Sequence, residues 1–125
     1  METFQLEGFE RIYELATFKK EFERTVNERR IIYPPFPRYQ KWLISCLTIL
    51  DVEGEAAIQS GKFEQLIMDS KPKIYSMRYP HSKKNVRVLY GFKDNKIILL
   101  LAFAEKSGSD YKKNIDTAQR RLNKL

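Results

Sequence analysis

The sequence predicts an α+β fold in which two N-terminal helices pack on a small twisted antiparallel sheet that is followed by a C-terminal helix. Three observations predict it. Apolar residues recur at helical spacing in the first 51 residues. From Lys73 the period changes to two, the spacing of strands with one buried face. The 125 residues contain no repeat and no linker, which favours a single domain over 1–125.

The first half of the chain is expected to be mainly helical. "ERIYELATF" (10–18) suits a short strand, and a helix follows it because Phe18, Phe22 and Val26 share one face. "YPPFP" ends this helix, since proline fixes φ and lacks a donor. A second helix over about 38–51 has an apolar face that includes Leu43 and Cys46. "VEGEAAIQSGKFEQL" (52–66) is ambiguous and is compatible with a broken helix that stops at Gly61.

The second half is expected to form three strands and a helix. The strands are "KIYSMRY" (73–79), "VRVLYGF" (86–92) and "KIILLLAF" (96–103), joined by "PHSKKN" and "KDNK". In the second link, Asp94 and Asn95 tolerate the positive φ of a primed hairpin turn. The last helix covers 110–125, with Ile115, Ala118 and Leu122 on its apolar stripe.

The two links set the register of the strands. The expected cross-strand pairs are Tyr79–Val86, Arg78–Arg87, Lys93–Lys96, Gly91–Ile98 and Arg87–Ala102. The face expected to pack on helices carries Tyr75, Met77, Tyr79, Val86, Val88, Tyr90, Phe92, Leu99, Leu101 and Phe103. The opposite face carries Ser76, Arg78, Arg87, Leu89, Gly91, Ile98, Leu100 and Ala102. Two adjacent arginines repel each other, so this second face needs a carboxylate neighbour or an anionic ligand. Because Gly91 and Ala102 are small, we expect a shallow cationic site there.

Charge is distributed unevenly along the chain. Residues 1–70 hold 9 Lys/Arg and 12 Asp/Glu, a net charge of −3, and residues 71–125 hold 14 and 4, a net charge of +10; together they give +7. A basic half of this strength suits a nucleic acid. A solvated lysine-rich surface with an acidic protein partner is the alternative.

Several classes of protein and several kinds of site are not expected from this sequence. No run of 18 apolar residues and no signal-peptide pattern is present, so we expect a cytoplasmic protein with no membrane partner. One cysteine and one histidine argue against a zinc site of these ligands, and we expect no metal and no cofactor. Cys46 lies on an apolar helix face and is expected to be a core residue.

Residues 74–122, "IYSMRYPHSKKNVRVLYGFKDNKIILLLAFAEKSGSDYKKNIDTAQRRL", resemble the RelE/ParE toxin superfamily, and most closely its HigB-like, phage-related branch. "YSMR", "VRVLYGF", "LAFAEKS" and "KKNIDTAQRRL" stand where that branch has its two arginine strands, its strand ending in two lysines, and its last helix. Two positions depart from the pattern: Leu101 replaces a histidine and Glu105 replaces the first lysine. The resemblance implies a RelE-like fold and a toxin that cleaves mRNA, often in the ribosome. It also implies a helix-turn-helix antitoxin as partner.

The chemistry of such an enzyme follows from RNA itself. The 2′-hydroxyl is a built-in nucleophile, so cleavage needs orientation, charge stabilisation on the phosphorus and protonation of the leaving oxygen. Arg78 and Arg87 are the candidates for the phosphate, and Lys106 for a further contact or proton donor. The general base stays open, with His81 and Tyr111 as candidates. Contacts to backbone phosphates are assigned to Lys83, Lys84, Lys112 and Lys113.

Two other functions remain open. The same fold could serve a ParE-like toxin that inhibits a gyrase by protein contact, or an inactive phage-related binding protein. Neither needs paired arginines beside a small-residue pocket. A DNA-binding structural protein is less consistent with the sequence, which has no recognition-helix motif.

Overall fold

One mixed sheet of six strands organises the computed structural model, which describes residues 2–66, 71–79 and 85–125. The strand order across the sheet is β1-β2-β6-β5-β4-β3. Neighbouring strands are antiparallel except β2 and β6, which run parallel. The elements are β1 (Thr3–Gln5), β2 (Ile12–Leu15), α1 (Phe18–Val26), α2 (Arg38–Glu53), the 3₁₀ helix η1 (Gly54–Ser60), β3 (Phe63–Gln65), β4 (Tyr75–Arg78), β5 (Val86–Lys93), β6 (Lys96–Ala104) and α3 (Gly108–Asn123).

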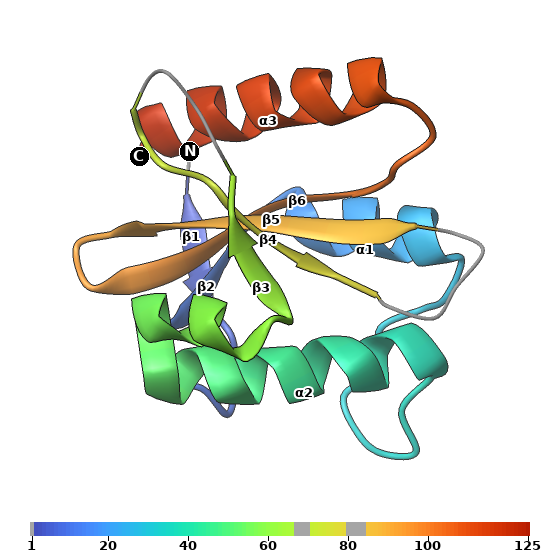
Figure 1. Cartoon of the computed structure of the whole chain (residues 1–125). Coiled ribbons are helices and arrows are strands. Elements are labelled where there is room, and N and C mark those ends of the chain that lie inside the picture. Colours follow the sequence, from blue (N-terminus) through green and yellow to red (C-terminus); the bar gives the residue numbers. More distant parts are fainter. Residues whose placement is uncertain (1, 67–70, 80–84) are drawn as a thin grey trace.

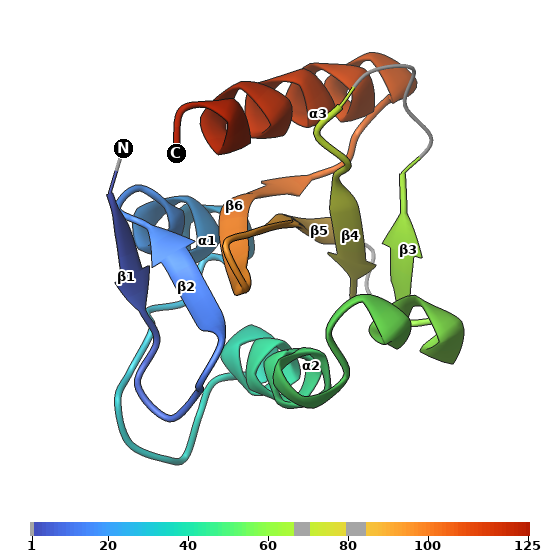
Figure 2. The same ribbon diagram turned by 90° about the vertical axis from the view of Figure 1, so that its left-hand side faces the viewer.

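Helices cover both faces of the sheet, with α2 below it and α3 above it in Figure 1. The edge-on view in Figure 2 shows the same three layers. The α2-side core joins Phe18 and Phe22 of α1 and Leu47 of α2 to the sheet. The α3-side core joins Ala118 and Leu122 of α3 to the opposite face. Cys46 is 4% exposed in the α2-side core, which confirms the prediction that it is a core residue.

The prediction that the chain begins with two helices on an antiparallel sheet is wrong. The first two elements are the strands β1 and β2, and β2 lies parallel to β6 with Ile12 beside Ile97. The two helices follow these strands at the expected positions. Strands of three and four residues show too few alternating positions to be recognised, and the partner that makes β2 a strand lies far along the chain. The sheet is therefore mixed and six-stranded.

The register predicted for the central strands is confirmed at four pairs. Arg78 faces Arg87, Gly91 faces Ile98 and Lys93 faces Lys96, and the Tyr79 N–H donates to the Val86 carbonyl. The β5–β6 turn has φ of 52° at Asp94 and 64° at Asn95, as a primed turn requires. Local turn chemistry thus sets the geometry of this hairpin.

A bulge overturns the fifth predicted pair. The register of β6 against β5 shifts in the middle of the ladder, where Leu100 is the extra residue, so that Arg87 faces Phe103 and not Ala102. Beyond the bulge the faces exchange: Leu101 and Phe103 belong to the α3-side core and Ala102 to the α2-side core. The face assignment of these three residues from strict alternation is therefore wrong.

The second sheet face is also not an open site. A Cβ on Gly91 would lie 2.6 Å from Cδ2 of Leu122, so this glycine is the point where α3 approaches the sheet closely. The space expected beside Gly91 is filled by α3, and Ala102 lies on the other face. What remains accessible is the end of the face, where β4 ends and β5 begins.

Candidate functional site

The paired arginines lie directly opposite each other on β4 and β5, but their environments differ. Arg87 is 7% exposed. Arg78 is exposed, and it has no hydrogen bond or ion pair to any of the residues that the structure describes. One guanidinium is therefore built into the protein, and the other is presented to solvent beside it.

Arg87 is held by two carboxylates and a hydroxyl. Its Nη1 donates to Glu64 Oε1 at 2.6 Å and to Ser76 Oγ at 3.1 Å, and its Nε donates to Glu105 Oε2 at 2.8 Å. Burial lowers the pKa of Arg87, but the hydrogen bonds to Glu64 and Glu105 more than offset this, so the pKa is raised. The arginine pair thus has two carboxylate neighbours, Glu64 and Glu105.

Both carboxylates come from other elements. Glu105 follows β6; it also accepts from Asn85 Nδ2 at 2.8 Å, while its own N–H donates to the Asn85 carbonyl at 2.9 Å. Glu64 lies on the edge strand β3. The sequence reasoning missed its role, because residues 52–66 suited a broken helix. The available signal was alternation: if Phe63 points into the α2-side core, Glu64 must point to the face that carries Arg87.

Tyr111 lies over Arg87, with 4.8 Å between the Arg87 Cζ and the ring centroid. It is placed there by the start of α3, where Ser107 caps the helix by accepting from the Asp110 N–H at 3.4 Å. Burial raises the pKa of the Tyr111 phenol, and the opposing effect of Arg87 does not cancel it. The phenol is therefore protonated at neutral pH and can donate a hydrogen bond.

The candidate lysines that the structure describes lie on the surface near the same end. Lys106 is exposed between β6 and α3, and Lys112 and Lys113 are exposed on α3. A shallow hollow of about 430 Å³ lies along this part of α3. It is lined by Gly108, Ser109, Lys112, Lys113, Asp116 and Arg120. Three cations against one carboxylate make this hollow basic.

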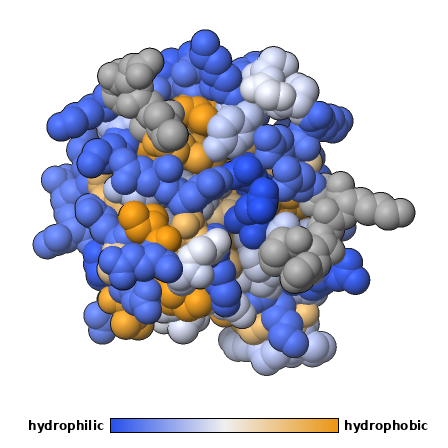
Figure 3. Space-filling model, in the orientation of Figure 1, coloured by the Kyte–Doolittle hydropathy of each residue, from blue (hydrophilic) through white to orange (hydrophobic). Residues whose placement is uncertain are grey.

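The structure thus brings Arg78, Arg87 and Tyr111 together, with Lys106 in the segment that joins β6 to α3. His81, Lys83 and Lys84 lie outside the described residues. Among the residues that are described, no group of three or more His, Cys, Asp or Glu side chains is arranged to hold a metal ion. Within the same residues, no helix has the length and apolar character needed to cross a membrane. The face seen in Figure 3 is mostly hydrophilic, with small separate apolar patches.

Comparison with protein families gives one match, over residues 51–123, to the family described as phage derived protein Gp49-like (DUF891). The matched segment contains the whole Arg87 cluster described above, and the family is in general of the RelE/HigB-like toxin kind. Because the match covers more than half of the chain, the protein belongs to this Gp49-like, phage-derived family. Neither the search of curated proteins nor that of solved structures gives a significant match.

Proposed function

We propose that this protein is the toxin of a type II toxin–antitoxin pair and that it cleaves mRNA, without a metal and on the ribosome. The supporting observation is the position of Arg78, which is exposed, lacks a described partner, and lies directly opposite Arg87. A free guanidinium held beside a fixed one is a suitable phosphate ligand, because its planar fork donates two hydrogen bonds. We take the phosphate to be that of an RNA because the chain belongs to a toxin-like family.

Each nearby group has a place in the proposed chemistry. Arg78 contacts the scissile phosphate and stabilises its developing charge. Arg87 keeps β3, β5 and the end of β6 together through Glu64 and Glu105, and it supports the ring of Tyr111. Tyr111 or Lys106 donates a proton or a hydrogen bond to the leaving oxygen.

The remaining roles are contacts to phosphates away from the scissile bond and the general base. Lys112 and Lys113 contact backbone phosphates, as do Lys83 and Lys84 in the proposal. The general base in this scheme is His81 and not Tyr111, because burial raises the pKa of the Tyr111 phenol and so suits it to donate.

A second candidate function is favoured by the two carboxylates on Arg87. A phosphate that approached Arg87 would have to displace Glu64 or Glu105, and both are hydrogen-bonded to it. This arrangement suits a toxin of the same family that acts by protein contact, such as inhibition of a gyrase, with no nuclease step. The partner in either case is an antitoxin, for which a small helix-turn-helix protein encoded beside the toxin is the candidate.

Induced expression distinguishes the two functions. For the ribonuclease, growth stops and translated transcripts become shorter, and purified protein cleaves mRNA on ribosomes. Arg78→Ala should lower cleavage by roughly a hundredfold, as loss of a charged contact to a transition state does. Arg11→Ala is the matched control, because the main chain of Arg11 is bonded to Ile97, at the end of the β5–β6 ladder opposite to Arg87. Intact transcripts with DNA damage would favour the gyrase, and an Arg78→Ala protein of unchanged rate would remove Arg78 from the site.

A further inference from the structure

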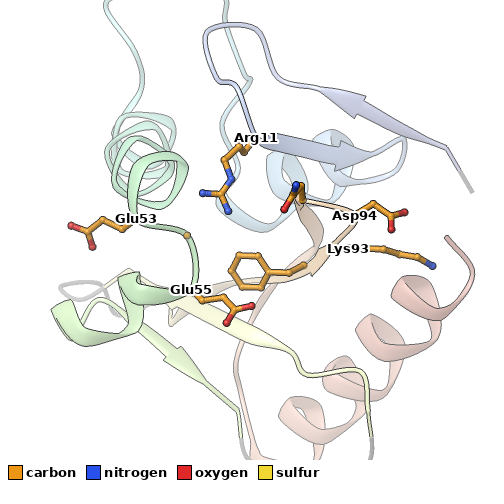
Figure 4. A pocket seen from close by; sticks show the side chains of 8 residues that line it. Arg11, Glu53, Glu55, Lys93 and Asp94 are labelled. Carbon is orange, nitrogen blue, oxygen red and sulfur yellow. The ribbon is translucent and has the colours of Figure 1, made fainter.

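A second site lies at the other end of β5 from Arg87. There, a pocket of about 420 Å³ opens between the start of β2, the junction of α2 with η1, and the β5–β6 turn (Figure 4). It is lined by Arg11, Glu53, Gly54, Glu55, Phe92, Lys93, Asp94 and Asn95. The residues proposed for RNA cleavage are not among these, so the pocket is separate from the candidate site.

Arg11 is positioned in this pocket by its main chain. Its N–H donates to Asp51 Oδ1 at 2.7 Å, and its carbonyl accepts from the Ile97 N–H at 2.8 Å. Asp51 is therefore occupied by main-chain donors, since Oδ2 also accepts from the N–H of Glu10 at 3.1 Å. The guanidinium itself has no hydrogen bond or ion pair to the described part of the chain, and it points into the pocket (Figure 4).

Gly54 provides the surface on which this guanidinium rests. A Cβ at Gly54 would lie 2.9 Å from Nη2 and 3.0 Å from Nη1 of Arg11. The φ of Gly54 is +58°, which L residues rarely adopt. A side chain here would displace the guanidinium, so Gly54 leaves the room that lets a cation lie inside a concave site.

The charges around Arg11 limit what it can bind. The carboxylates of Glu53, Glu55 and Asp94 line the pocket but are directed away from the guanidinium (Figure 4). The ammonium of Lys93 donates to the Leu125 carbonyl and points away from the Arg11 guanidinium (Figure 4). With two cations and three carboxylates, the lining has a net negative charge, which repels a strand of consecutive phosphates. The Arg11 guanidinium can still attract a single anion that has cations on either side.

We propose that this pocket binds a segment of a partner protein in which one Asp or Glu is flanked by Lys or Arg. The carboxylate takes a bidentate pair with Arg11, and the flanking cations lie against the outward carboxylates of Glu53, Glu55 and Asp94. Phe92 provides apolar lining for the methylene stems of those cations. The inference does not depend on RNA cleavage, because it uses none of the residues of that site.

Chemical-shift titration of the full-length ¹⁵N-labelled protein with short blocked peptides tests this proposal. Acetyl-Lys-Asp-Lys-amide should shift the Arg11 Nε–H and the Gly54 and Asn95 amides, with roughly millimolar affinity. Acetyl-Lys-Asn-Lys-amide should not, because it lacks the carboxylate. Acetyl-Ala-Asp-Ala-amide should bind more weakly than the Lys-flanked peptide, although the net charge of +7 on the protein favours the more anionic one.

The variants make the assignment specific to Arg11. Arg11→Gln should lower the affinity for the Lys-Asp-Lys peptide about tenfold, whereas Arg24→Gln, with the same change of charge, should leave it unchanged. Should Arg11→Gln fail to fold, the three peptides still decide the question on the natural protein. Equal shifts by the Asp and Asn peptides would overturn the proposal. So would no shift at these three groups, or tighter binding of an oligouridylate than of the Lys-flanked peptide, which would indicate an RNA site.

Discussion

Arg87→Ala should destabilise the fold, and the structure allows the size of the effect to be worked out. The substitution removes a side chain that is 7% exposed and that two carboxylates and the Ser76 hydroxyl contact. Glu64 and Glu105 would then lose the same cation at once. Because Arg78 carries a like charge on the neighbouring strand, some repulsion is relieved, but both carboxylates are closer partners of Arg87.

The solvent exposure of the two carboxylates determines how much the free energy of unfolding falls when Arg87 is replaced. Removing one partner of a fully buried ion pair costs about 3–5 kcal/mol. Here the Glu105 side chain is 22% exposed and that of Glu64 is 55% exposed, so water restores part of their hydration. We therefore expect a loss of about 2–3 kcal/mol in the free energy of unfolding. For a domain of this size that corresponds to a fall in Tm of about 6–15 °C.

Urea and thermal unfolding followed by circular dichroism measure this loss. Arg78→Ala is the matched control, and it should change stability by less than about 0.5 kcal/mol because the side chain is exposed. A double-mutant cycle of Arg87→Ala with Glu105→Gln should show coupling of about 1 kcal/mol or more. An Arg87→Ala protein as stable as the natural one would refute the view that these carboxylates hold Arg87 in place. It would return Arg87 to the role of a free phosphate ligand.

Three further outcomes are expected. Gly91→Ala should lower the free energy of unfolding by about 1–3 kcal/mol, because its Cβ would meet Leu122. Adding Leu122→Ala should not fully restore this stability, since it leaves a cavity. Unchanged urea unfolding of Gly91→Ala would contradict the close approach of α3. Burial raises the pKa of Cys46 to about 11, so at pH 8 only about one thiol in a thousand is ionised; iodoacetamide should modify the native protein at least a hundredfold more slowly than the urea-unfolded one, and equal rates would place Cys46 outside the core. Co-expression with the product of the adjacent gene should give a stable complex and restore growth; a complex that forms without restoring growth would contradict neutralisation by that partner.

Local sequence was sufficient for the parts of the fold whose cause is local. α1 and α2 follow from their apolar faces, and the β5–β6 hairpin follows from two residues that accept positive φ. The Arg78–Arg87 pair could be predicted because register propagates from a turn along a ladder. That propagation fails at Leu100, where one extra residue exchanges the faces beyond it. A bulge depends on how β6 curves against its neighbours, and an alternating pattern cannot show it.

The environment of Arg87 was decided by tertiary structure alone. The strand pattern and the two links are enough to predict that two arginines meet on one sheet face and need anionic neighbours. Whether those neighbours are protein or ligand depends on β3 and on the segment after β6, which bring in Glu64 and Glu105. In the same way, the parallel pairing of β2 with β6 and the packing of α3 over Gly91 join distant segments. Such contacts form because the complete chain buries both sheet faces at once, so no short stretch of sequence carries their signal.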